Sequence, residues 1–179
     1  MLPITIPGFE YFDEKTGKII TVKSQDLQLE HSLVSISKWE SKWKKPFLAD
    51  KAKTKEETID YIRCMTLTQH VDPLVYNGVT YNNIQAVNNY IADPMTATTF
   101  KKKQGKSSSS VITSEIIYYW MISLEIPMEC QKWHLNRLLT LIRVCDEKSQ
   151  PGKKMSKRDV MNQYKSLNAA RRSKYGTRG

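Results

Sequence analysis

The sequence has few of the residues that build small reactive sites. Its three cysteines, Cys64, Cys130 and Cys145, form an odd number without close spacing. This pattern argues against a disulfide framework and favours a reducing compartment. None of the seven glycines stands in the spacing of a phosphate-binding loop. No CxxC or HxxxH pair occurs either, so the common short zinc-binding motifs are missing.

Long apolar runs are also missing. No stretch approaches the roughly 18 uncharged apolar residues of a membrane-spanning helix, so we expect no membrane partner. The segment Met1–Pro7 has neither a basic start nor an apolar centre, and we expect no signal peptide there. The length of 179 residues fits one domain with an appendage, and the hydrophobic content of 40% suggests a sizeable exposed fraction.

Positive charge is concentrated at the C-terminal end. The chain has a net charge of +10, but the first 147 residues contain 18 basic and 17 acidic side chains. The segment Lys148–Gly179 contains 10 basic residues and one acid, Asp159. Such a segment is typical of contact with nucleic acid or with an acidic protein surface, and a purely solubilising tail is the alternative.

The clearest strand pattern lies at the N-terminus. Apolar residues alternate around Ile4–Phe12 and again at Ile19–Val22, with the turn-forming segment Asp13–Lys18 between them. We expect a short β-hairpin within residues 1–24.

The remaining sequence predicts helices. Leu33, Ile36, Trp39 and Trp43 share one face of a helix over about 29–45, with Ser35 and Glu40 on the other faces. Capping patterns at Thr54 and Thr80 begin further helices. The expected elements are helices over about 54–65, 80–92, 113–122, 127–146 and 157–174, with a short turn over 72–78.

The fold class predicted is therefore mainly α, with five to six helices, a short N-terminal β-hairpin and a basic C-terminal helix or tail. We expect a helical body over residues 1–147 and a basic segment over 148–179. The helix 113–122 is apolar on nearly every face, which predicts a buried position at the centre of the fold.

The segment Glu129–Cys145 combines cysteine, histidine and arginine and could be a metal or nucleophile site. On a continuous helix, Cys130 and His134 would share a face. Cys145 would lie roughly 22 Å further along that axis, too far for a shared metal. Leu135, Leu138, Ile142 and Cys145 instead follow the spacing of a packing helix. We therefore expect no catalytic residue, no metal and no cofactor.

Two other segments are candidates for partner binding. Trp39 and Trp43 stand among lysines and glutamate, which is compatible with a core position or with an exposed contact. Lys101–Lys106 and the four serines after it predict a flexible loop, either solvated or in contact with nucleic acid.

Several stretches together resemble a family of proteins encoded with the tails of long-tailed bacteriophages, the tail assembly chaperones. They are, in chain order, LEHSLVSISKWESKWKKPFL (Leu29–Leu48), TIDYIRCMT (Thr58–Thr66), PMTATTF (Pro94–Phe100), ITSEIIYYWMISLEIP (Ile112–Pro127), CQKWHLNRLLTLIRVC (Cys130–Cys145) and the ending KKMSKRD…LNAARRSKYGTRG. The resemblance covers nearly the whole chain.

The resemblance implies a non-enzymatic helper in the cytoplasm of the host cell during phage assembly. Its partners would be the helical tape-measure protein and the tail-tube subunits, and self-association is left open. The candidate contact residues are Trp39, Trp43, Lys153, Lys154, Lys157, Arg158, Arg171, Arg172 and Lys174.

Two alternatives stay open from the sequence. The chain could be a structural component of the virion, such as a head–tail connector or a tail-completion protein. It could also bind nucleic acid through its basic end, although it contains no recognised base-reading motif.

Overall fold

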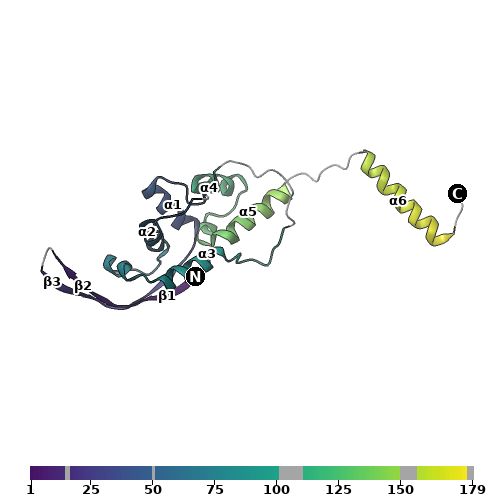
Figure 1. The fold of residues 1–179 in the computed structure, drawn as a ribbon. Coiled ribbons are helices and arrows are strands. Elements are labelled where there is room, and N and C mark those ends of the chain that lie inside the picture. Colours follow the sequence, from purple (N-terminus) through teal and green to yellow (C-terminus); the bar gives the residue numbers. More distant parts are fainter. Residues whose placement is uncertain (15–16, 50, 101–110, 150–156, 177–179) are drawn as a thin grey trace. The chain divides into compact units, whose positions relative to one another are not determined.

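A computed structural model describes residues 1–14, 17–49, 51–100, 111–149 and 157–176 (Figure 1). The chain forms two compact units, Met1–Arg143 and Val144–Gly179. The boundary predicted between residues 147 and 148 falls within the second unit. The fold is mainly α with a small β part, as the sequence predicts.

The β part is longer than the predicted hairpin. Its strands are β1 (Leu2–Ile6), β2 (Phe9–Asp13), β3 (Lys18–Val22) and β4 (Gln25–Leu29). β1 pairs with β4 and β2 pairs with β3, and both pairs keep the same antiparallel register, from Leu2 opposite Leu29 to Asp13 opposite Lys18. The four strands therefore form one two-stranded ribbon, interrupted at Pro7, which has no N–H to donate. In Figure 1 its β2–β3 end extends away from the helices.

The predicted start of the first helix was wrong, because β4 occupies residues 25–29. Ile4, Ile6, Leu27 and Leu29 are buried on one face of the ribbon, so this alternation extends the sheet past the predicted hairpin. The helix begins only after Ser32, whose side chain accepts a hydrogen bond from the backbone N–H of Ser35.

Most of the helices lie where the sequence predicts them. Their bounds are α1 (Leu33–Trp43), α2 (Lys55–Met65), η1 (Pro73–Gly78), α3 (Tyr81–Ala92), α4 (Ser114–Ser123), η2 (Met128–Lys132), α5 (Leu135–Ser149) and α6 (Lys157–Tyr175), with η marking 3₁₀ turns. The capping boxes at Thr54 and Thr80 are formed, since each hydroxyl accepts the N–H three residues on.

α1 lies at the centre of the body, and α4 does not. α1 contacts α2, α4 and η2, and its Leu33 and Ile36 are fully buried. α4 buries Ile117 and Met121, while Tyr119 and Ile122 are 66% and 68% exposed. The prediction that helix 113–122 is buried on all faces was wrong, because only one side of it meets the core.

Gly8 stands at the interruption of the ribbon, close to the backbone of the opposite strand. A Cβ on Gly8 would lie 2.8 Å from the carbonyl oxygen of Val22 and 2.9 Å from the amide nitrogen of Ser24. Both are backbone atoms that cannot move without disturbing the pairing. We therefore expect Gly8→Ala to lower the free energy of unfolding by about 2 kcal/mol, measured by urea denaturation.

Gly17 supplies the matched control for this substitution. It has φ of +64° in the turn and nothing within 4 Å of its added Cβ. Gly17→Asn keeps a residue that tolerates this backbone conformation and should change the stability much less. Equal losses for the two variants would contradict the close-approach argument.

Candidate partner-binding sites

The segment Glu129–Cys145 is not one helix, which changes the geometry of the reactive-looking patch. η2 ends at Lys132, and α5 begins at Leu135 after a break at Trp133. Cys130 and His134 would share one face only on a continuous helix. Because the helix is interrupted between them, they do not.

The chemistry of this patch is that of a packed interior. Leu135, Leu138 and Ile142 are buried as predicted, and Cys145 is half-buried. In the described parts of the chain, no group of three or more His, Cys, Asp or Glu side chains is placed to hold a metal ion. The third cysteine, Cys64, lies outside this patch on α2, and burial raises the pKa of its thiol to about 11.

His134 belongs to a buried polar network and not to the margin of the fold. Its Nε2 lies 2.9 Å from the carbonyl oxygen of Tyr90, and its ring meets that of His31 edge-on at 5.1 Å between centroids. His31 Nδ1 lies 2.5 Å from the hydroxyl of Tyr61. The hydroxyl of Tyr90 donates to the carboxylate of Glu30 at 2.8 Å. The network thus joins the β4–α1 connection to α2, α3 and the start of α5.

The environment of His31 in this network keeps its imidazole uncharged at neutral pH. Burial, with a contribution from His134, lowers the pKa of His31 to about 3. Burial also raises the pKa values of Tyr61 and Tyr90 above their usual range. His31 and His134 are only 1% and 6% exposed, so they serve the packing of the body.

The indole groups of Trp39 and Trp43 both donate hydrogen bonds to α2. Trp39 is 2% exposed, and its indole N–H donates to the carbonyl oxygen of Glu57 at 2.9 Å. Trp43 is half-buried, and its N–H donates to the carboxylate of Asp60 at 2.8 Å. Trp39 is therefore a core residue and is not available as an exposed anchor. Only Trp43 keeps part of its ring at the surface.

Two ion pairs fasten the end of α1 to α2 beside these rings. Lys42 pairs with Asp60, and Lys45 pairs with Glu57 at 2.5 Å. The charge that surrounds the tryptophans in the sequence is thus partly used inside the body. The tryptophans and charged residues of this segment therefore join the end of α1 to α2.

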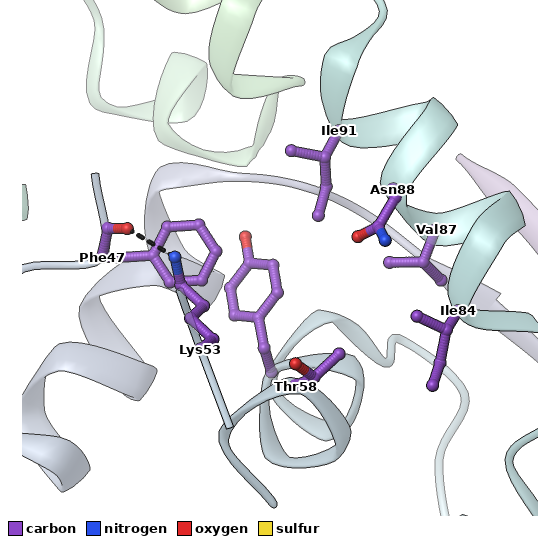
Figure 2. Close-up of a pocket in the computed structure, with 8 residues that line it drawn as sticks. Phe47, Lys53, Thr58, Ile84, Val87, Asn88 and Ile91 are labelled. Atoms are coloured by element: carbon purple, nitrogen blue, oxygen red, sulfur yellow. Dashed lines mark hydrogen bonds between the residues drawn. The ribbon is translucent and has the colours of Figure 1, made fainter. Parts of the chain in front are cut away.

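A groove opens next to this junction, between α2 and α3 (Figure 2). Its volume is about 340 Å³, near the lower end of ligand-sized clefts. The connection between α1 and α2, together with α2 and α3, supplies its lining residues: Phe47, Lys53, Thr58, Tyr61, Ile84, Val87, Asn88 and Ile91. We call this hollow the α2–α3 groove.

Lys53 is the one charged residue among the described residues of that lining. Its ammonium lies 4.1 Å from the centre of the Phe47 ring and donates to the carbonyl oxygen of Phe47 at 2.9 Å. Burial lowers the pKa of Lys53, while the charge of Glu57 opposes that shift. This site could not be predicted from the sequence because its lining comes from three segments. The one local hint was the alternation of lysines at 51, 53 and 55.

The remaining candidate residues lie at the C-terminal end of the chain. In α6, Met161, Tyr164 and Leu167 are 62%, 63% and 48% exposed, and they lie three residues apart along one side of the helix. Arg171 and Arg172 are also exposed in α6. Lys157, Arg158 and Lys174 fall within α6, but their side chains lie outside the described part, and Lys153 and Lys154 lie outside the described residues altogether.

Comparison with protein-family models, with curated proteins and with solved structures finds no match for this chain. Among its described helices, none is long and apolar enough to cross a membrane.

Proposed function

We propose that this chain is a non-enzymatic phage tail morphogenesis protein, a tail assembly chaperone that binds the tape-measure protein and the tail-tube subunits. The proposal starts from the sequence resemblance to that family. It places the protein in the host cytoplasm during assembly and assigns its function to binding surfaces.

The observation that carries the proposal is the exposed side of α6. Met161, Tyr164 and Leu167 form an apolar stripe on a helix of 19 residues that also carries exposed Arg171 and Arg172. An isolated helix of this length is marginal in water, and burial of its apolar stripe against a partner stabilises it. A basic amphipathic helix suits a partner surface that is apolar and acidic.

The expected function is tested by co-expression with the tape-measure gene of the same phage. We expect the full chain to co-purify with the tape-measure protein. Replacing Met161, Tyr164 and Leu167 together by serine should lower the recovered partner at least tenfold, because buried apolar anchors dominate such interfaces. Arg171→Glu with Arg172→Glu should weaken recovery and remove most of its salt dependence.

A matched variant replaces exposed apolar residues of the body. Leu67 and Tyr81 are 53% and 72% exposed, and their replacement by serine should leave co-purification unchanged. Detection of this chain in stoichiometric amounts in purified virions would contradict the chaperone function. It would support the alternative, a structural component of the virion. Capture of DNA by the wild-type chain, lost with the two Arg→Glu changes, would instead support nucleic-acid binding.

A further inference from the structure

The α2–α3 groove has an apolar floor formed by one side of α3. Ile84, Val87 and Ile91 are spaced three and four residues apart, so they line one side of α3 and face the groove. Phe47 and Tyr61 close the other wall, with their rings 4.0 Å apart. The space accepts an aromatic or branched aliphatic side chain in contact with both walls.

Lys53 gives this groove a polar requirement. A lysine ammonium has three N–H donors, and one of them is directed at the carbonyl oxygen of Phe47. Among the described residues, the ion pairs of this region join Lys42 to Asp60 and Lys45 to Glu57, and none includes Lys53. A half-buried cation over an aromatic ring favours an anion that enters with an apolar body.

The chain segment that supplies Phe47 and Lys53 to the groove carries the same sign of charge. The segment Lys44–Lys55, which contributes Phe47 and Lys53 to the lining, contains five lysines and one acidic residue that precedes α2, Asp50. Lys44, Lys45, Lys51 and Lys55 are all exposed. A positively charged segment next to a binding groove attracts an acidic partner and repels a basic one.

We propose that the α2–α3 groove binds an acidic amphipathic segment of a partner protein, with an apolar side chain on the α3 floor and a carboxylate on Lys53. The identity of that partner rests on the proposed function, in which it is a phage tail protein. The groove is a second contact, made by other residues than the apolar stripe of α6, and like that stripe it suits an acidic partner.

The proposal is tested with the full chain and a synthetic peptide of Leu-Glu-Glu-Leu repeats, acetylated and amidated. Labelled methyl groups of Ile84 and Ile91 report binding in the groove by NMR, and those of Ile122 on α4 report binding elsewhere. We expect shifts at Ile84 and Ile91 that saturate with peptide concentration, and none of that size at Ile122.

Two control peptides separate the apolar and charged requirements. A Ser-Glu-Glu-Ser peptide keeps the acidic charge that the basic C-terminal segment attracts, and it should leave Ile84 and Ile91 unchanged. A Leu-Lys-Lys-Leu peptide should bind at least tenfold more weakly, because Lys53 and the other lysines of the Lys44–Lys55 segment repel it. If either control moves the two methyl groups as the test peptide does, the proposed occupant is wrong.

Lys53→Met keeps the aliphatic stem over Phe47 and removes the charge. We expect it to weaken the peptide about tenfold, while Lys132→Met, an exposed lysine of η2, changes nothing. Ile91→Asp supplies a second variant, which should abolish the shift at Ile84 with the circular dichroism spectrum preserved. Unchanged affinity in Lys53→Met would overturn the proposal.

The two proposals fail in different ways. If the peptide binds the groove but the tape-measure protein does not co-purify, the groove stands and its phage partner is wrong. If the tape-measure protein co-purifies but the peptide leaves Ile84 and Ile91 unmoved, the groove is wrong and the chaperone function stands.

Discussion

Glu40→Ala is expected to lower the free energy of unfolding by about 4 kcal/mol, measured by urea denaturation followed by circular dichroism. Glu40 is 8% exposed although it lies on α1 among charged neighbours. Its two carboxylate oxygens accept hydrogen bonds from two backbone N–H groups, of Phe47 at 2.7 Å and of Ser114 at 2.8 Å. Alanine would leave both of these buried donors without an acceptor, and each such loss costs about 1–3 kcal/mol.

The effect should be large because Glu40 replaces a missing helix cap. Thr113 occupies the N-cap position of α4 but makes no capping hydrogen bond with its side chain. The carboxylate of Glu40 takes that role from another helix, and its negative charge also favours the N-terminal end of α4. The same side chain thus fixes α4 against α1 and the Phe47 segment against both.

Glu40→Gln gives the graded control. Its amide oxygen can accept one of the two hydrogen bonds while its NH₂ group faces the other donor, so roughly half of the loss should remain. Glu129→Ala removes an exposed glutamate of η2 and should change the stability by less than about 0.5 kcal/mol. A loss below about 1 kcal/mol for Glu40→Ala would mean that water satisfies these donors.

Helices whose local capping motif was recognised were predicted correctly from the sequence. α2 and α3 begin at Thr54 and Thr80, whose hydroxyls cap the helix within the same four residues. α1 was started too early because Ser32 was not recognised as its cap. The expected start near residue 29 overlaps the end of β4, whose pairing with β1 joins residues 19 to 27 positions apart in the sequence.

The remaining errors also have distant causes. Glu40 was assigned to a polar helix face because its partners, Phe47 and Ser114, belong to other elements. The apolar composition of α4 predicted a central position, but composition alone does not determine how many sides of a helix pack against other elements. The break before α5 coincides with the hydrogen bond from the N–H of Leu135 to the carbonyl oxygen of His31, a contact across 104 residues.

The sequence predicted the residue types of the candidate site, aromatic side chains and lysines, but not its position. The sequence indicated a contact near Trp39 and Trp43, where aromatic residues alternate with lysines. The structure buries Trp39 and places a hollow beside Phe47 and Lys53, a few residues later in the chain. The groove forms where Phe47, Lys53 and Tyr61 meet one side of α3, and only the packing of three segments determines that.

His31→Gln is expected to remove most of the acid sensitivity of folding between pH 7 and pH 5. The pKa of His31 is lowered from 6.5 to about 3 in the folded chain, so the unfolded chain takes up the proton first. Stability should therefore fall as the pH drops below about 6.5, at up to about 1.4 kcal/mol per pH unit. For the wild-type chain this amounts to about 2 kcal/mol between pH 7 and pH 5.

The environment of His31 explains why the proton is excluded. Tyr61 of α2, Phe47 and His134 face its ring, and burial weighs more than the charge of His134. Glutamine keeps a polar partner for the Tyr61 hydroxyl but has no proton to gain. It should lower the stability at pH 7 by about 1–2 kcal/mol while flattening the pH profile.

Urea denaturation at pH 7, 6 and 5 measures this difference. His70→Gln changes an exposed histidine and should retain the wild-type slope. Acidic side chains titrate mostly below this window, so they do not mask the effect. A wild-type slope that persists in His31→Gln would contradict the assignment of this proton uptake to His31.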